Sequence, residues 1–233
     1  MFGSFLEKLN ELGKPSYHIY SDYIGFDDDF NEKPVFTENM LKYKKIVFGS
    51  SFNQPLNDLP NHIEHLELNG DFDQDIDFLP ENLITLKITG KFNRSIKNLP
   101  RKLKKLIING HYNQPFENLP ELEQLIIEGS FNQSIDNLPD TIKLLVLGIM
   151  FNQPINKTPK MLQYINLGSK FNQNIDYLSD YIITIELGIS FEQIITKLPK
   201  NIMIIKLKGD NDITNQNIEF IKKNYPLAKI LRK

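Results

Sequence analysis

The phrase FNQSIDNLP at residues 131–139 decides the fold of this chain, because close relatives of it recur along the sequence. The phrase FNQPLNDLP occupies residues 52–60, and further copies begin at Phe72, Phe92, Tyr112, Phe151, Phe171 and Phe191. Successive copies start 20 residues apart, except that the unit beginning at Tyr112 has 19 residues. A phrase with a fixed period is typical of a chain that stacks one structural unit on itself. A catalytic site, in contrast, needs a few unlike groups that converge once.

Each unit carries six apolar positions and ends in the pattern L-x-x-L-x-L followed by glycine. In this ending, apolar residues such as Leu66 and Leu68 lie two apart, which is the period of a strand with one buried face. Twenty residues are too few for a strand and a crossover helix of several turns, and the Leu-Pro, Asn and Gly positions favour tight turns. We therefore expect one strand per unit. Stacking the units about 4.8 Å apart as a parallel sheet buries each unit against the next.

The repeated phrase also resembles a known family. The L-x-x-L-x-L ending is similar to a leucine-rich repeat, and the full phrase F-N-Q-x-[IL] with a following L-P resembles the FNIP repeat, a short leucine-rich-repeat-like unit known mainly from slime-mould and giant-virus proteins. The resemblance covers residues 52–209. The expected fold is a mainly β, leucine-rich-repeat-like right-handed solenoid with a parallel concave sheet and short helical caps at both ends.

We expect one continuous domain in three parts. Residues 1–29 hold an N-terminal helical cap, with the capping box of Ser4 and Glu7, and a first irregular strand around Ile24. Residues 30–209 form the repeat solenoid, which begins with a longer, irregular unit that starts FNEKPV. Residues 210–233 form a C-terminal cap, with a helix within TNQNIEFIKKNY and a last short strand near Ile230.

Composition excludes several classes of function. Lysine plus arginine (27) nearly balance aspartate plus glutamate (29), so no overall basic field predicts nucleic-acid binding. The chain has no cysteine, which excludes disulfides, thiolate zinc sites and a cysteine nucleophile, and favours the cytoplasm. The sequence contains no run of about 18 apolar residues, so it predicts no membrane span. Charged residues interrupt the N-terminal segment where a signal peptide would be apolar.

The sequence predicts no metal site, no cofactor and no catalytic residue. The carboxylates of DFDQDIDF (residues 71–78) alternate like the start of a calcium loop, but Ile76 and Asn82 stand where glycine and a bidentate glutamate are needed. His62 and His65 lie three apart on a segment that leads into a strand, where they need not converge. We find no Ser-His-Asp arrangement. An enzyme with an unrecognised site is kept as an alternative class.

Two polar columns follow the aromatic of each unit. An asparagine usually stands directly after the aromatic, and a glutamine stands next. A polar side chain that recurs once per layer predicts hydrogen bonds to backbone groups at the turn, where the sheet ladder cannot pair them. The alternative is a row of amides that grips an extended ligand.

One face of the predicted sheet carries an apolar centre. If Leu125 and Ile127 point into the core, Ile126 points to the opposite side of the sheet. The same outward column is charged toward both ends but apolar in three central layers, and the adjacent column adds two further apolar side chains. We predict that these five residues bind a partner: Ile107, Ile126, Leu144, Val146 and Tyr164. The alternative is that β-branched residues merely suit a pleated surface.

The expected function is a non-enzymatic scaffold that binds a partner protein, of unknown identity, on its concave sheet. The resemblance to FNIP proteins implies a protein-interaction role, sometimes beside an F-box that recruits ubiquitin-ligase machinery. Only about 16 residues precede the first expected strand, too few for the helices of an F-box. The alternative is therefore a substrate-recognition or regulatory subunit of a ubiquitin-ligase assembly that acts without its own F-box.

Overall fold

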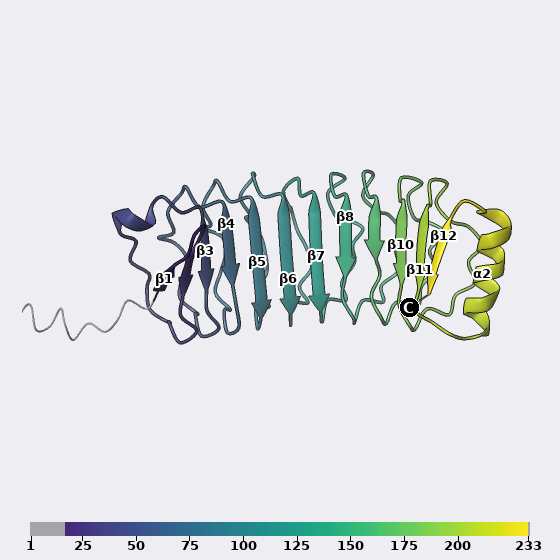
Figure 1. Ribbon diagram of the computed structural model, residues 1–233, viewed down its shortest axis with the longest axis horizontal. Helices are drawn as coiled ribbons and strands as arrows, with labels where there is room; N and C mark the ends of the chain where they lie inside the picture. The colour runs from purple at the N-terminus through teal and green to yellow at the C-terminus, as the bar shows by residue number, and fades with distance from the viewer. Residues whose placement is uncertain (1–16, 233) are drawn as a thin grey trace, which may run out of the picture.

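The structure, a computed structural model, describes residues 17–232, and these residues form one 12-stranded sheet in which the strands lie side by side in sequence order (Figure 1). The first two strands pair antiparallel, and every later pair is parallel. The strands are β1 (Tyr17–Ile19), β2 (Ile24–Phe26), β3 (Lys45–Phe48), β4 (His65–Leu68), β5 (Thr85–Gly90), β6 (Lys105–Gly110), β7 (Gln124–Gly129), β8 (Leu144–Leu147), β9 (Tyr164–Asn166), β10 (Thr184–Leu187), β11 (Ile204–Leu207) and β12 (Lys229–Arg232). The predicted β solenoid with a parallel sheet is confirmed. Its right-handed coil stays a prediction.

Strands of neighbouring units pair without any slip in register. Leu66 pairs with Leu86, and Leu86 pairs with Leu106, so each apolar position lies beside its equivalent in the next layer. Within β4 to β8, buried and partly exposed residues alternate at the start of each strand. A slip of one residue would turn every buried side chain toward solvent, so the alternation itself fixes the register. The outward side chains of equivalent positions therefore form rows across the sheet.

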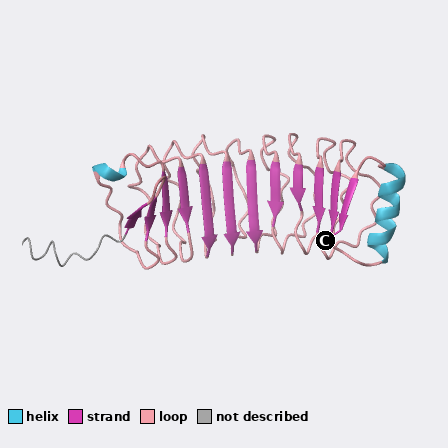
Figure 2. Ribbon diagram, viewed as in Figure 1, coloured by secondary structure: helices cyan, strands magenta, loops and turns pink. Residues whose placement is uncertain are grey.

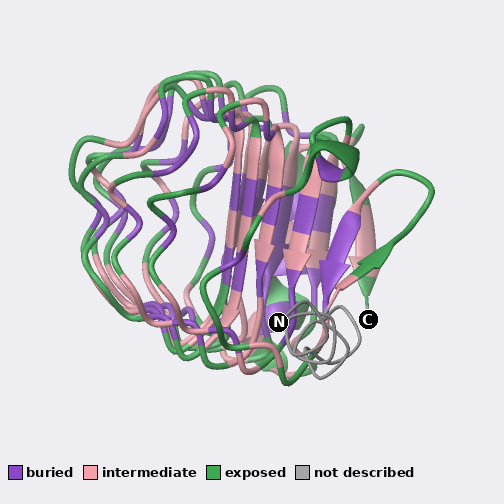
Figure 3. Ribbon diagram, turned by 90° about the vertical axis from the view of Figure 1, so that its left-hand side faces the viewer, coloured by how far each residue is buried: buried purple, intermediate pink, exposed green. Residues whose placement is uncertain are grey.

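The core lies between the sheet and the loops that return to it (Figure 3). The aromatic column is buried in every layer and forms a ladder of near-parallel rings, with centroids 5.8 to 6.3 Å apart from Phe52 to Phe191. The other apolar columns are buried as predicted, except that Leu99 and Leu119 are only partly buried. Both lie in loops: Leu119 belongs to the unit that is one residue short, and Leu99 belongs to the unit before it.

The asparagine column is structural, as predicted. In each layer the side-chain oxygen accepts a hydrogen bond from the backbone N–H of the equivalent residue in the next layer, at 2.8 to 3.1 Å. Most of the following glutamines donate to the same oxygen. The acceptors are Asn31, Asn53, Asp73, Asn93, Asn113, Asn132, Asn152 and Asn172. This ladder satisfies backbone donors at the turn where the chain has left the sheet.

The predicted caps differ at the two ends (Figure 2). The C-terminal helix is confirmed as α2 (Asp212–Asn224), and the last predicted strand is confirmed as β12. The predicted N-terminal helix, with Ser4 and Glu7, lies outside the described residues. At that end the structure describes an antiparallel pair, β1 and β2, and a short 3-10 helix, η1 (Glu38–Met40), in the longer first unit. The predicted early strand is β2, whereas the antiparallel partner β1 carries no repeat pattern and was not predicted.

Candidate functional site

The open face of the sheet, which we define by the outward side chains of β3 to β11, carries the predicted partner-binding residues. Ile107, Ile126 and Val146 pair directly in register across β6, β7 and β8. Leu144 pairs with Tyr164 on the same face. All five are half-buried, so each side chain is held by its neighbours and still presents part of its surface to solvent. The structure thus brings the five residues together as one group, which we call the apolar strip.

Charged residues border the apolar strip on its N-terminal side, and they are paired with one another. The Glu67 carboxylate on β4 lies between two lysines, 3.1 Å from the ammonium of Lys45 and 3.2 Å from that of Lys87. Burial raises the pKa of Glu67, but the hydrogen bonds from the two lysines outweigh burial and hold its pKa below the ordinary value. These three side chains therefore form a cross-strand ion cluster next to the strip.

A second cluster borders the strip on its C-terminal side. The buried Glu186 carboxylate accepts hydrogen bonds from the Tyr164 hydroxyl and the Lys206 ammonium. Burial raises the pKa of Glu186, but these two donors outweigh burial and leave its pKa below the ordinary value. Burial and the neighbouring carboxylate raise the pKa of Tyr164. Tyr164 thus belongs to the strip through its ring and to the ion cluster through its hydroxyl.

The open face also carries a hollow that was not predicted from the sequence. It has a volume of about 410 Å³ and begins at Val146, so it is continuous with the apolar strip. Its lining includes Asn109, Glu128, Asn166 and Lys208. The sequence does carry a sign of this hollow. In the units that contain β8, β9 and β10, the glycine at the end of the repeated pattern comes one residue earlier than in the units of β5 to β7.

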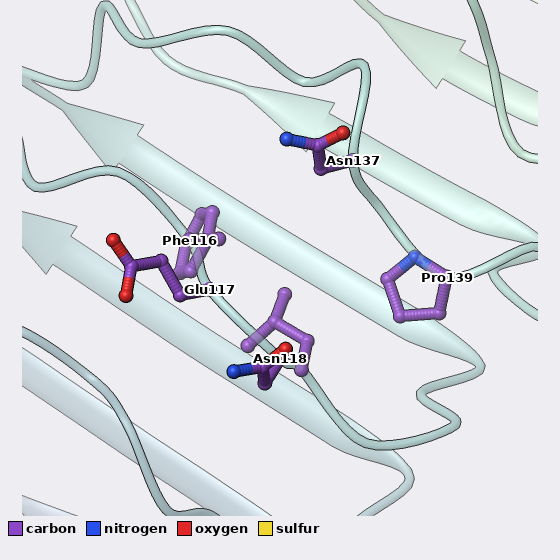
Figure 4. Close-up of a pocket in the computed structure, with 6 residues that line it drawn as sticks. Phe116, Glu117, Asn118, Asn137 and Pro139 are labelled. Atoms are coloured by element: carbon purple, nitrogen blue, oxygen red, sulfur yellow. The ribbon is translucent and has the colours of Figure 1, made fainter.

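Another hollow, of about 500 Å³, lies among the loops that return to the sheet (Figure 4). It forms in and beside the unit that is one residue short, where Asn118 adopts a left-handed backbone conformation with φ of 53°. Its lining is Phe116, Glu117, Asn118, Leu119, Asn137 and Pro139. Glu117 is the one ionisable side chain in this lining, so the hollow offers no pair of groups for acid–base or nucleophilic chemistry.

Three aspartates of the acidic run and His62 make contacts within the chain. The Asp71 carboxylate lies 2.7 Å from the Lys91 ammonium, and Asp73 and Asp75 both face Arg94, at 3.6 and 3.7 Å. A ring nitrogen of His62 lies 3.1 Å from the carbonyl oxygen of Tyr43. Within residues 17–232, no three or more His, Asp or Glu side chains are placed to hold a metal ion. No helix in this part of the chain is both long and apolar enough to cross a membrane.

The stacked units, the parallel sheet and the open face define a leucine-rich-repeat-like solenoid. Comparisons with known proteins agree: the family described as FNIP Repeat matches residues 52–91, which confirms the resemblance to FNIP repeats for this segment. The crystal structure of the giant-virus protein CroV588, described as a novel circular LRR protein structure, is similar to this chain, with a TM-score of 0.71 and 33% sequence identity. The match covers 80% of this chain and 30% of CroV588, so the chain spans less than a third of that protein. No curated protein matches.

Proposed function

We propose that this chain is a non-enzymatic scaffold that binds a partner protein through the apolar strip on the open face of its sheet. The observation that carries this proposal is the pairing of Ile107, Ile126 and Val146 in three consecutive layers between two ion clusters. An apolar centre with a polar rim is the arrangement of protein-binding patches. The flanking carboxylates are already paired with lysines within the chain. A partner would therefore gain binding free energy mainly by burying the exposed apolar surface of the strip.

The spacing of the layers supports a concave sheet. Equivalent rings of the aromatic ladder lie 5.8 to 6.3 Å apart, whereas hydrogen-bonded strands lie about 4.8 Å apart. Because the rings lie further apart than hydrogen-bonded strands usually do, we infer that the solenoid bends with the sheet on its inner side. A concave sheet surrounds a partner on more than one side, which suits a scaffold.

The electrostatics of the open face also favour binding over catalysis. Its two carboxylates with a lowered pKa, Glu67 and Glu186, are held by lysines of neighbouring strands. A catalytic acid or base needs a pKa that is moved toward the working pH. Lowering a carboxyl pKa moves it in the opposite direction, so these groups act as structural ion pairs.

A double substitution within the strip tests this proposal. Ile126→Glu with Val146→Lys places two charges at its centre without touching the buried columns, so circular dichroism should report an unchanged fold. The proteins captured by the purified chain from its native cells should be lost. Phe78→Glu with Tyr177→Lys is the matched control, because both residues are exposed apolar side chains in the loops. If the strip variant stays folded and retains the same proteins with unchanged affinity, the strip is ordinary strand surface.

A further inference from the structure

The hollow beside the apolar strip, which we call the notch, lies at a step in the edge of the sheet. Strands β5, β6 and β7 each have six residues, whereas β8, β9 and β10 have four, three and four. Figure 1 shows the arrowheads of β5 to β7 reaching beyond those of β8 to β10. The floor of the notch is formed at this step by Val146, Leu147, Gly148 and Gly168.

The step follows from a shift of one residue in the terminal glycine. In the units of β5 to β7, a side chain precedes the glycine on the open face, as Asn109 precedes Gly110 and Glu128 precedes Gly129. In the next three units glycine itself takes that position, as Gly148, Gly168 and Gly188. The following unit restores a side chain there, Lys208. Three layers therefore lack a side chain between Glu128 and Lys208.

The floor of the notch cannot be filled by a larger residue at these positions. A Cβ atom on Gly168 would lie 2.0 Å from the carbonyl oxygen of Gly148, and a Cβ atom on Gly188 would lie 1.9 Å from that of Gly168. A Cβ atom on Gly148 would lie 2.4 Å from the backbone nitrogen of Gly129. The close approach of successive layers thus requires glycine, and the absence of side chains leaves a fixed depression on the open face.

The two ends of the notch carry opposite charges, and the charge of Lys208 also helps to lower the pKa of Glu186. The Glu128 carboxylate accepts a hydrogen bond of 3.0 Å from the Asn109 side chain. Within residues 17–232, neither Glu128 nor Lys208 forms an ion pair, and both side chains are exposed. In contrast, Glu67 and Glu186 on the same face are each paired with lysine. The notch therefore offers one anion and one cation to an occupant.

We propose that the notch binds an extended peptide segment of the partner, with a basic side chain at Glu128, an acidic side chain at Lys208 and an apolar side chain between them against Val146 and Ile149. This inference rests on the proposed function, because the notch shares Val146 with the apolar strip. Glu128 and Lys208 are four layers apart, which corresponds to about 19 Å at the usual strand spacing. An extended chain covers that span in about six residues. The segment runs across the strands, since β8, β9 and β10 are already paired on both sides.

Selection from a random dodecapeptide library displayed on phage, with the purified full chain as bait, tests this assignment. The wild type should enrich peptides with one basic and one acidic residue about six positions apart and an apolar residue between them. Glu128→Lys should enrich peptides with two acidic residues, and Lys208→Glu should enrich peptides with two basic residues. Either reversal should weaken the best wild-type peptide about tenfold at low salt, and less at high salt. Glu117→Lys, an exposed loop substitution, is the matched control and should keep the wild-type pattern.

Each other outcome is decisive. If peptides are enriched without the charge pair, or if the reversals leave their pattern unchanged, the notch assignment is wrong. The proposed function then stands only if Ile126→Glu with Val146→Lys abolishes that binding. If the wild type enriches no peptide, the notch assignment is wrong, and the proposed function is decided by the capture experiment with Ile126→Glu and Val146→Lys. A wild-type dimer in sedimentation that Lys208→Glu dissociates would identify a second copy of the chain as the occupant, and would overturn the peptide assignment.

Discussion

The side chain of Asn217 in α2 binds the backbone of Ile195 in the last full layer, because its oxygen accepts from the Ile195 N–H at 2.8 Å. Its amide nitrogen also donates to the carbonyl oxygen of Gln193, at 2.9 Å. A buried asparagine of the helix thus satisfies backbone groups that would otherwise have no next layer beside them. The helix closes the solenoid by hydrogen bonding as well as by covering apolar surface.

Asn217→Ala should therefore destabilise the chain by about 1–3 kcal/mol, because it leaves buried backbone groups unpaired. Urea unfolding measures the loss, and hydrogen exchange should be faster at the Ile195 amide than in the wild type. Gln216→Ala, at an exposed position of the same helix, should change the unfolding free energy by less than about 0.5 kcal/mol. Equal effects of the two substitutions would show that Asn217 does not act through these bonds.

Tyr112→Phe should stabilise the chain. The Tyr112 hydroxyl is the one buried side-chain polar atom in the described residues without a hydrogen-bond partner, and every other ring of the aromatic column is phenylalanine. An unpaired buried polar group costs about 1–3 kcal/mol, so its removal should raise the unfolding free energy by about 1 kcal/mol or more. Urea unfolding of both proteins measures the change.

Tyr225→Phe is the matched control for that substitution. The Tyr225 hydroxyl accepts from the Leu198 N–H at 2.8 Å and donates to the Leu198 carbonyl at 3.1 Å. Loss of these bonds should destabilise the chain by about 1 kcal/mol. A loss of stability in Tyr112→Phe would mean that its hydroxyl has a hydrogen-bond partner in solution.

Phe131→Ala should cost about 3–5 kcal/mol, because it opens a cavity in the aromatic ladder. The Phe131 ring is fully buried, with centroids 6.2 Å from Tyr112 and 6.3 Å from Phe151. Lys143→Gln removes an exposed ion pair with Glu123 and should stay within about 0.5 kcal/mol. A loss below about 1 kcal/mol for Phe131→Ala, measured by urea unfolding, would contradict the burial of this column.

The repeat made most of the fold predictable. Equivalent apolar positions have the same surroundings in every layer. The eight copies of the pattern therefore identify both the buried positions and the register in which β4 to β11 pair. The N-terminal strand β1 was missed because it pairs antiparallel and belongs to no repeat, so its pairing depends on a turn that the period does not encode. Leu119 was predicted to be buried but is only half-buried. It lies in the unit that is one residue short, and the shorter loop changes the burial of Leu119 without changing the apolar pattern of the sequence around it.

The candidate site was predictable in part, for a related reason. Ile107, Ile126 and Val146 lie together because strand alternation and the repeat period fix both their side of the sheet and their neighbours. The ion clusters were not predicted, because they depend on which rotamers bring Lys45 and Lys87 to Glu67. The notch was missed because a glycine one residue early still fits the repeated ending, and only the backbone shows that the strand is then shorter.

The stability of the chain should depend on pH through Glu186, whose pKa in the folded state lies below its ordinary value of 4.5. A carboxyl with a lowered folded-state pKa stabilises the fold in its ionised form, so its contribution is fully present above about pH 4.5 and is lost as the pH falls through the folded-state pKa. The measurement is the difference in unfolding free energy between the wild type and Glu186→Gln, by urea unfolding at several pH values from 7 to 3. This difference should be constant down to the ordinary pKa and then shrink. A difference for Glu186→Gln that stays constant down to pH 3 would mean that the Tyr164 and Lys206 contacts do not stabilise the ionised carboxylate.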